Sequence, residues 1–452
     1  MRMRRWDFTA AYLQGALLEG EVVYCLPPPG YTADGRIGKD NRVCKVVKPI
    51  YGMTQAGRRW QRSLFPWLEE IGFKATESDS CVFQKTETRA TPSGPREEKV
   101  VIGCYVDDLQ VLYKEDDDDS LYRSFTTALQ ERWQVEDEGD LTDLLGVEFQ
   151  FGDGWVKLHQ AAYIDRMTNS FFPDGPPKHS SRSKVPCDPT LPQLISDAQT
   201  QDPADIDPEL VRQYQQIVGS LLYAATNTRP DISYSVGMLS RAMARPTPML
   251  LICALRVLEY LHHSRELGLR YAAKATHKSP VASDELFGMS DSDWAVKHST
   301  TGWLFMLSQA TVSWGSKKQV SVALSSCEAE IMAASDAAKE ALYLRRFAAE
   351  LGMTDDPSRS TALFVDNMSA IDVAYNPEHH GKVKHIERRH FFIREAVEDM
   401  KIRVPFVATA DNWADFFTKA LPTKQFVALR NQLMNVPIED TGIPASAGMG
   451  GC

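Results

Sequence analysis

The chain has 452 residues, of which 43% are hydrophobic and 24% are charged, and its formal net charge is −10. This length is too great for one ordinary core and predicts two to four domains. The acidic balance argues against a general nucleic-acid coating protein, which would be basic. No apolar run approaches the roughly 20 residues of a membrane-spanning helix, and eight cysteines without a Cys-x-x-Cys pair argue against a disulfide or zinc framework. We therefore expect a soluble intracellular protein.

The first candidate acid along the chain is Asp7, in the stretch Trp6-Asp-Phe-Thr-Ala-Ala-Tyr12. This stretch predicts a strand that ends in a helix, which places Asp7 at the strand terminus, a common position for metal-binding carboxylates. A helix N-cap is the alternative for Asp7. Further on, Gln55 precedes a predicted helix with apolar residues at helical spacing. Arg58 stands three residues after Gln55. From these residues alone, Tyr12 would be predicted as a core side chain. For Arg58, a surface salt bridge is as good an explanation as a contact with a substrate.

The central acidic pair is Asp107-Asp108, inside an otherwise apolar run over residues 100–113. Two β-prone arms around the pair predict a hairpin whose turn carries both carboxylates. Adjacent carboxylates repel unless they share a cation, and a hard ion such as Mg²⁺ prefers oxygen ligands. A solvated acidic turn is the alternative reading of an isolated Asp-Asp pair. A second hairpin is predicted from residues 144–149 and 155–160.

The middle of the chain is predicted to be scaffold. Residues 173–208 are rich in Pro, Ser, Lys, Asp and Gln, which predicts a linker that contributes nothing to a core. Helical periodicity resumes at Tyr214 and continues to Leu261, with a break at Arg229-Pro-Asp231. Asp231 follows a helix and a proline, which is typical of a capping arrangement and gives no reason to expect chemistry there.

From residue 285 the sequence predicts three strands, a long helix, a strand, helices, a strand and a helix. Acidic residues fall at strand ends or near helix starts, and the four candidates are Asp291, Glu330, Asp366 and Asp415. Glu328 and Asp293 are rivals. We prefer Glu330 because Glu328 completes a capping box with Ser325, and Asp291 because it directly ends an apolar strand. Each acid alone is most often a surface residue. If all four converge, two Mg²⁺ about 4 Å apart would neutralise them and clamp an attacking water and a leaving oxygen.

Several motifs in chain order resemble the polymerase of copia-type LTR retrotransposons. They span residues 6–15, 23–31, 48–60 and Tyr105-Val-Asp-Asp108, and segments at 219–223 and 228–232 resemble the part that joins polymerase to nuclease. The region from residue 285 resembles ribonuclease H (RNase H) in its element order and its four acids. The resemblance covers most of the chain and identifies it as the C-terminal part of a copia-type Pol polyprotein, truncated before the fingers region.

The resemblance implies a multidomain protein of mixed α+β and α/β class. Its expected parts are an incomplete reverse transcriptase palm and thumb, a linker, a helical thumb or connection segment, an RNase H-like domain and a disordered tail. The boundaries are 1–172, 173–208, 209–280, 281–435 and 436–452.

The resemblance also implies two catalytic metal sites that use Mg²⁺ or Mn²⁺. The polymerase site would hold Asp7, Asp107 and Asp108, with Tyr12, Gln55 and Arg58 near the nucleotide and template. The RNase H site would hold the four acids named above. The implied partners are dNTPs, a primer-template, an RNA–DNA hybrid and other parts of the Gag and Pol polyproteins. The chain could also form a dimer. The expected location is the cytoplasm or virus-like particles, with access to the nucleus and without attachment to a membrane.

Two alternatives remain beside this reading. In the first, the polymerase half is inactive and only RNase H works. In the second, the chain is a non-catalytic nucleic-acid-binding remnant. Primer extension and hybrid cleavage separate the three.

Overall fold

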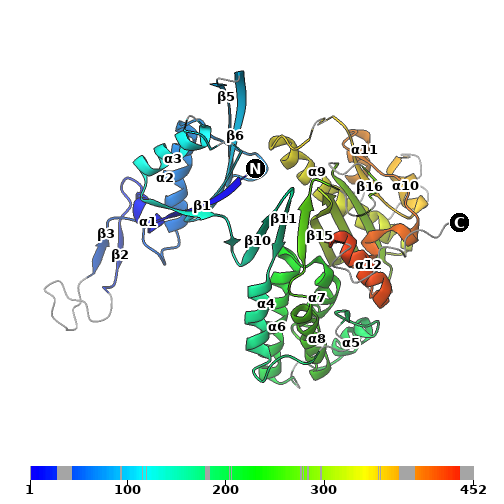
Figure 1. Cartoon of the computed structure of the whole chain (residues 1–452). Coiled ribbons are helices and arrows are strands. Elements are labelled where there is room, and N and C mark those ends of the chain that lie inside the picture. Colours follow the sequence, from blue (N-terminus) through cyan, green and yellow to red (C-terminus); the bar gives the residue numbers. More distant parts are fainter. Residues whose placement is uncertain are drawn as a thin grey trace. The chain divides into compact units, whose positions relative to one another are not determined.

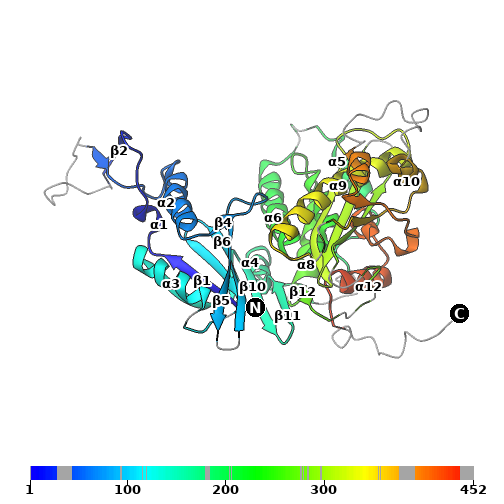
Figure 2. The same cartoon turned by 90° about the horizontal axis from the view of Figure 1, so that it is seen from above.

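The computed structural model describes residues 2–27, 43–91, 94–114, 116–118, 120–178, 184–202, 204, 206–274, 277, 279–281, 285–295, 298–354, 356, 358–375 and 392–437. By the contacts between its residues, the chain divides into two compact units, Met1–Leu141 and Thr142–Cys452 (Figure 1, Figure 2). Within the described ranges, no helix combines the length and the apolar character needed to cross a membrane.

The first unit is built on an antiparallel sheet of six strands in the order β4-β5-β6-β7-β1-β8. The strands are β1 (Arg2–Phe8), β4 (Lys74–Ala75), β5 (Val82–Thr91), β6 (Gly94–Tyr105), β7 (Asp108–Tyr113) and β8 (Val135–Asp140). The predicted central hairpin is confirmed, because β6 and β7 pair and leave Val106 and Asp107 as its turn. The prediction that the turn carries both carboxylates is wrong for Asp108, which is the first residue of β7 and pairs with Tyr105. Strand β1 lies between β7 and β8, so the start of the chain runs beside the hairpin.

Three helices and a short ribbon complete the first unit. They are α1 (Ala11–Gln14), α2 (Ala56–Glu70), α3 (Leu121–Arg132), β2 (Val23–Cys25) and β3 (Cys44–Val46). The predicted helix is confirmed as α2, whose apolar side chains at helical spacing are all buried. Among them, Trp60 packs edge-on against Phe8 and Trp133, with ring centroids 4.8 and 5.2 Å apart. This aromatic core fixes α2 against β1.

The second unit begins with a four-stranded antiparallel sheet in the order β12-β11-β10-β9, followed by a group of helices (Figure 1). The strands are β9 (Asp143–Leu144), β10 (Val147–Gly152), β11 (Trp155–His159) and β12 (Gly268–Ala272). The helices are α4 (Ala161–Phe171), α5 (Leu191–Ala198), α6 (Pro208–Asn227), the 3₁₀ turn η3 (Pro230–Ile232), α7 (Ser233–Ser240) and α8 (Pro248–His263). Strands β10 and β11 are the second predicted hairpin, which is confirmed.

The prediction that residues 173–208 contribute nothing to a core is wrong at α5. Leu191, Ile195 and Ala198 are at most 3% exposed and belong to the same core as α6, α7 and α8. Their spacing is that of one apolar helix face. The polar and proline-rich residues around this short helix hid it in the overall composition of the segment.

The capping interpretation of Asp231 is also wrong. Both its side chain and that of Arg229 are fully buried, and the guanidinium donates to the carboxylate over 2.9 and 2.7 Å. The Tyr260 hydroxyl donates to the same carboxylate, and Ser264 accepts from Arg229. Asp231 and its partners join η3 to α8. Asp231 is therefore part of the scaffold, as predicted, but it acts through an ion pair and not as a helix cap.

The rest of the second unit is a five-stranded sheet in the order β15-β14-β13-β16-β17. The strands are β13 (Phe287–Asp293), β14 (Thr300–Leu307), β15 (Ala310–Lys318), β16 (Thr361–Phe364) and β17 (Ile402–Arg403). The other elements are α9 (Ser326–Glu350), α10 (Met368–Tyr375), α11 (Phe392–Glu398), η6 (Thr409–Asp411), η7 (Trp413–Phe417) and α12 (Thr423–Leu433). Strands β13 to β15 form a meander, and β16 and β17 run parallel to β13. This is the predicted element order, and the mixed α/β, RNase H-like fold class is confirmed.

Both faces of this sheet are covered, which explains the continuous apolar run of β14. Trp303 and Phe305 join one core with α9, α10 and α11. Leu304 and Met306, on the opposite face, join the core of α6, α7 and α8. The acids at the strand ends are thus set on a rigid sheet. The predicted disordered tail lies outside the described residues from residue 438 onward.

Candidate metal sites

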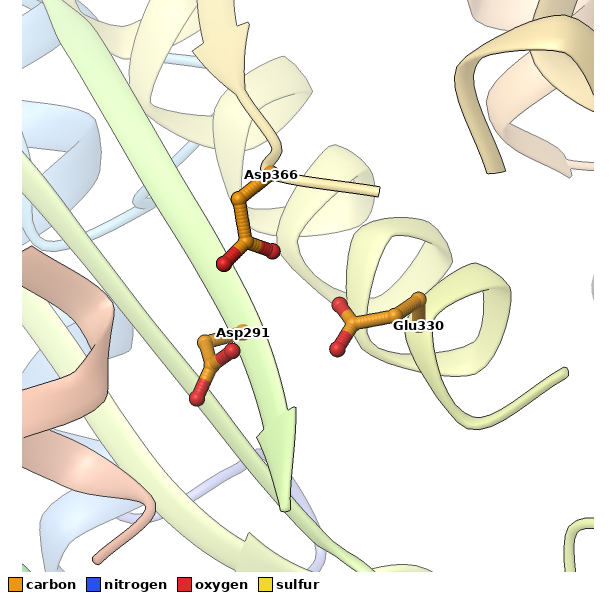
Figure 3. A group of neighbouring side chains, drawn as sticks. All are labelled: Asp291, Glu330 and Asp366. Carbon is orange, nitrogen blue, oxygen red and sulfur yellow. The ribbon is translucent and has the colours of Figure 1, made fainter. Parts of the chain in front are cut away.

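Three of the four acids predicted in the second unit lie together. One ligand oxygen from each of Asp291, Glu330 and Asp366 lies within 4.8 Å of the other two. Figure 3 shows Glu330 and Asp366 extending toward Asp291. Asp291 and Glu330 are each only 6% exposed, whereas Asp366 is half-buried. We call these three residues the acid triad.

The register of two parallel strands explains why two of these acids meet. Met289 of β13 is paired with Phe364 of β16. Asp291 stands two residues further along β13, and Asp366 stands two residues beyond Phe364, the last residue of β16. Because neighbouring parallel strands run in the same direction, residues an equal number of positions beyond a paired couple lie near the same edge of the sheet.

The capping of α9 brings the third acid to the same edge. The Ser325 hydroxyl accepts from the Glu328 amide over 3.1 Å, and the Glu328 carboxylate accepts from the Leu324 amide over 2.7 Å. Glu328 therefore serves the predicted capping box. Glu330 reaches β13 instead, where its Oε1 accepts from the amide and the hydroxyl of Ser292 over 3.2 and 2.9 Å.

The acid triad carries more negative charge than its surroundings offset. Glu330 Oε2 is buried and has no hydrogen-bond partner among the described residues. Burial, with the charge of Asp291 next, raises the pKa of Glu330 to about 8. Burial raises the pKa of Asp291 to about 7, against a hydrogen bond from Thr418 and together with the charges of Asp415 and Asp366. A buried, unpartnered carboxylate oxygen among hard oxygen donors fits a divalent cation such as Mg²⁺ or Mn²⁺.

The fourth predicted acid, Asp415, adjoins the triad but is engaged elsewhere. It is 4% exposed, and its Oδ1 lies 2.8 Å from the Lys419 ammonium. Its charge acts on Asp291, whose Oδ2 accepts a hydrogen bond from the Thr418 hydroxyl. The structure therefore brings three of the four predicted acids into one group and pairs the fourth with a lysine.

The side chain of Asn412 explains how η7, which carries Asp415, is held against the sheet. Its amide donates to the Ser290 carbonyl over 3.1 Å, next to Asp291. Its oxygen accepts from the Ala414 amide over 3.1 Å and so caps η7. One buried side chain thus fixes Asp415 relative to β13.

In the first unit, strand pairing brings Asp7 beside Asp107 and Asp108. Asp7 is the register partner of Asp108, and the Phe8 amide donates to the Asp107 carbonyl over 2.9 Å. The Asp107 carboxylate accepts from the Tyr51 hydroxyl over 3.4 Å. Asp108 forms an ion pair with Arg5 at 2.7 Å. Cross-strand neighbours on one face interact directly, so Asp7 shares one patch with the adjacent pair about a hundred residues further along the chain.

The electrostatics of this patch differ from those of the triad. Burial, and then the charges of Asp107, Glu138 and Asp108, raise the pKa of Asp7, while Arg5 opposes the rise. All three acids are half-buried. Within the part of the chain that the structure describes, they do not form a group whose ligand oxygens all lie within 4.8 Å.

The hairpin turn itself is strained and held from α2. Val106 has a φ of 57°, in the left-handed region, which is unfavourable for a β-branched residue. The Trp60 indole donates to the Val106 carbonyl over 2.5 Å. Sequence reasoning treated Trp60 only as core and missed Arg5 and Tyr51. The alternation of a strand could have found Arg5, which lies on the same face of β1 as Asp7.

The three residues predicted near the nucleotide have different surroundings. The Tyr12 ring packs on that of Tyr51 with centroids 4.4 Å apart, which places it beside the phenol that contacts Asp107. The Gln55 amide donates to Glu21 over 3.3 Å. Arg58 is exposed on α2. The structure brings Tyr12 close to the acidic patch and directs Gln55 toward Glu21.

Comparison with known proteins gives a consistent set of relatives. The profile of the family "Reverse transcriptase (RNA-dependent DNA polymerase)" matches residues 2–173. The Pol polyprotein from transposon TNT 1-94 of Nicotiana tabacum is 30% identical over 439 residues, which cover 94% of this chain and 30% of that protein. The Pol polyprotein from transposon RE1 of Arabidopsis thaliana is 32% identical over 94% of this chain and 27% of its own length.

A shorter relative matches almost end to end. The putative transposon Ty5-1 protein of Saccharomyces cerevisiae is 30% identical over 341 residues, which cover 74% of this chain and 99% of that protein. The chain thus spans less than a third of the two long polyproteins. Among solved structures, a foamy viral protease-reverse transcriptase in complex with double-stranded DNA aligns over 90% of this chain and 57% of its own, with 11% identity and a TM-score of 0.43.

Proposed function

Since the chain belongs to the copia-type retrotransposon Pol proteins, we propose that it is a reverse transcriptase with an RNase H domain. It would synthesise DNA on an RNA or DNA template and cut the RNA strand of the RNA–DNA hybrid. The acid triad with its buried, unpartnered Glu330 oxygen is the observation that carries the nuclease half. The family match over residues 2–173 and the strand pairing of Asp7 beside Asp107 and Asp108 support the polymerase half.

For the nuclease, Asp291, Glu330 and Asp366 would hold Mg²⁺ or Mn²⁺. Two divalent ions in such a site supply positive charge to the attacking water and to the leaving oxygen of a phosphodiester. The protein's part is to position them: Ser292 orients Glu330, and the parallel strands fix the other two acids. Asp415 would complete the set of four.

For the polymerase, Asp7 and Asp107 would hold the catalytic ions, and Asp108 would contribute charge from its pair with Arg5. A primer 3′-hydroxyl would attack the α-phosphate of a dNTP. Tyr12 would lie beneath the incoming sugar, where its ring leaves no room for a ribose 2′-hydroxyl. Arg58 is exposed and could contact phosphate, whereas Gln55 would first have to leave Glu21.

The remaining predictions become part of this proposal. The polymerase would occupy residues 1–172, the helical connection 209–280 and the RNase H domain 281–435. The substrates would be a primer-template, dNTPs and an RNA–DNA hybrid. Other parts of the Gag and Pol polyproteins would be its partners, in keeping with relatives three times as long.

RNase H activity alone is the second candidate, and one observation favours it. In the described residues, the only group of at least three acids close enough to share an ion is the triad of the second unit. Under this candidate the first unit would still hold the hybrid without extending a primer.

Two assays with the full chain and Mg²⁺ separate these functions. Primer extension should fall strongly in Asp107→Asn and persist in Asp291→Asn, while hybrid cleavage should show the reverse pattern. Cleavage without extension would leave RNase H alone. The absence of both would reduce the chain to a nucleic-acid-binding remnant.

A further inference from the structure

A lysine ammonium lies within the acidic site of the second unit. Lys419 Nζ is 2.8 Å from Asp415 Oδ1, and the lysine side chain is 45% exposed while that of Asp415 is 6% exposed. A lysine side chain is ordinarily a cation at neutral pH, so this ammonium places a positive charge directly beside a nearly buried carboxylate.

This lysine makes the two sides of the site unequal. On the Asp415 side, Lys419 offsets the carboxylate, and the neighbouring Thr418 hydroxyl donates to Asp291 Oδ2. On the triad side, Glu330 Oε2 is buried without a hydrogen-bond partner among the described residues. Asp415 Oδ1 also lacks a hydrogen bond of good geometry, so the two sides differ in charge and not in hydrogen bonding. Asp415 has an ammonium at 2.8 Å, whereas among the described residues Asp291, Glu330 and Asp366 form no ion pair.

Resting on the RNase H function proposed above, we propose that Lys419 is an internal counter-ion that delays metal binding on the Asp415 side. The acid triad binds a divalent ion first. A second ion binds next to Asp415 only after the ammonium has released its carboxylate, because two cations a few ångströms apart repel each other. The exposed, flexible lysine stem allows this release without movement of the sheet.

Metal binding tests this directly, without any measurement of activity. We would titrate Mn²⁺ into the full chain by calorimetry, with Asp107→Asn in every sample so that the polymerase acids contribute little. The key variants are Lys419→Met and Lys419→Gln, which remove the charge, and Lys419→Arg, which keeps it. Lys401→Met is the matched control, since Lys401 forms a similarly exposed ion pair with Asp399 at 2.8 Å.

The neutral variants should bind the second ion about tenfold more tightly than the parent protein, since one nearby positive charge is gone. Lys419→Arg and Lys401→Met should bind it as the parent does. Identical isotherms for Lys419→Met, Lys419→Gln and Lys401→Met, with circular dichroism showing all three folded, would overturn the role of Lys419.

Hybrid cleavage by the same samples separates this inference from the function on which it rests. If the parent binds Mn²⁺ and cleaves the hybrid while the lysine variants bind Mn²⁺ unchanged, only the counter-ion role fails. If the parent binds no Mn²⁺ in the second unit and cleaves nothing, the RNase H proposal fails, and the counter-ion role falls with it.

Discussion

The two acidic sites of this chain are assembled in different ways. In the second unit, Asp291 and Glu330 are almost fully buried, and burial raises the pKa of these acids to about 7 and about 8. In the first unit, Asp7, Asp107 and Asp108 are half-buried, and Arg5 forms an ion pair with Asp108. We therefore expect the triad to depend on an added cation more than the hairpin site does.

The difference shows how a fold can hold like charges together before any ion is present. In the RNase H-like sheet, strand register and a helix cap force the carboxylates into one buried space. Protonation must then limit the charge, because buried carboxylates without partners are unfavourable. In the six-stranded sheet of the first unit, solvent and an arginine limit the charge instead. We expect the two sites to respond differently to charge removal, to pH and to metal.

The largest expected effect is the loss of hybrid cleavage in Asp291→Asn. Asp291 belongs to the triad and also interacts electrostatically with Asp415. Its removal therefore disturbs both the triad and the surroundings of Asp415. We expect a loss on the order of a thousandfold, as for other groups that stabilise transition-state charge, with primer extension unchanged. Asp293→Asn, at the exposed end of the same strand, is the control and should cleave nearly normally. Equal losses in both variants would contradict the assignment.

The adjacent acids of the hairpin allow a finer comparison. We expect Asp107→Asn to reduce primer extension about a hundredfold. Asp108→Asn should reduce primer extension less than about tenfold, because Arg5 already offsets the charge of that carboxylate. Single-turnover extension rates at saturating Mg²⁺ measure both. A loss in Asp108→Asn as large as that in Asp107→Asn would show that Asp108 leaves Arg5 to bind metal.

These residues also show how far the sequence alone could reach. The strand patterns placed all three acids within two residues of a strand end: Asp7 and Asp291 lie just inside β1 and β13, and Asp366 lies just beyond β16. The prediction that Asp291 directly ends its strand is wrong, because β13 continues to Asp293. The capping box correctly separated Glu328 from Glu330, because capping is a local interaction between residues three apart.

Side-chain partners were not predictable in the same way. The pairs Arg5–Asp108 and Asp415–Lys419 depend on which rotamer each side chain adopts in the folded site. The helix α5 was missed because its apolar face spans only eight residues within a polar segment. Local pattern fixed the backbone positions of the acids, whereas the balance of charge around them arises only from tertiary packing.

The next effect concerns stability without metal. Glu330 has a pKa of about 8 when folded and 4.5 ordinarily. The folded protein therefore holds a proton that the unfolded chain has lost, and the stability of the second unit should fall as pH rises from about 4.5 to 8. We expect a decrease on the order of 5 kcal/mol, since each pKa unit corresponds to about 1.4 kcal/mol. Urea unfolding in EDTA measures it, and Glu330→Gln should flatten the slope.

Metal should reverse this pH effect. At pH 8, Mg²⁺ should restore the stability of the parent protein but add little to Glu330→Gln, since the variant has lost a ligand charge. Glu340→Gln, which removes another acid of α9 that accepts from Ser313, is the control and should keep the slope. If the free energy of unfolding of the parent protein does not change with pH, positive charges of the protein already offset the buried carboxylates.

The smallest expected effect comes from Arg5→Met, which would make the hairpin site resemble the triad. Arg5 contacts both Asp108 and Glu138, and its side chain is 26% exposed. Ion pairs of this exposure contribute about 1 kcal/mol or less, so urea unfolding of the first unit should shift only slightly. Arg2→Met, whose arginine is 63% exposed on the same strand, should shift it even less.

The response of Arg5→Met to metal is the more informative measurement. Without the guanidinium, the charges of Asp7, Asp107 and Asp108 are no longer opposed from β1, so Mg²⁺ should stabilise the variant more than the parent protein. That gain should shrink at high salt, because half-exposed charges are screened. If Mg²⁺ stabilises both proteins equally, Arg5 is not the reason that the hairpin site depends less on an added cation than the triad. The strained turn at Val106 and its bond from Trp60 would then be the feature to alter.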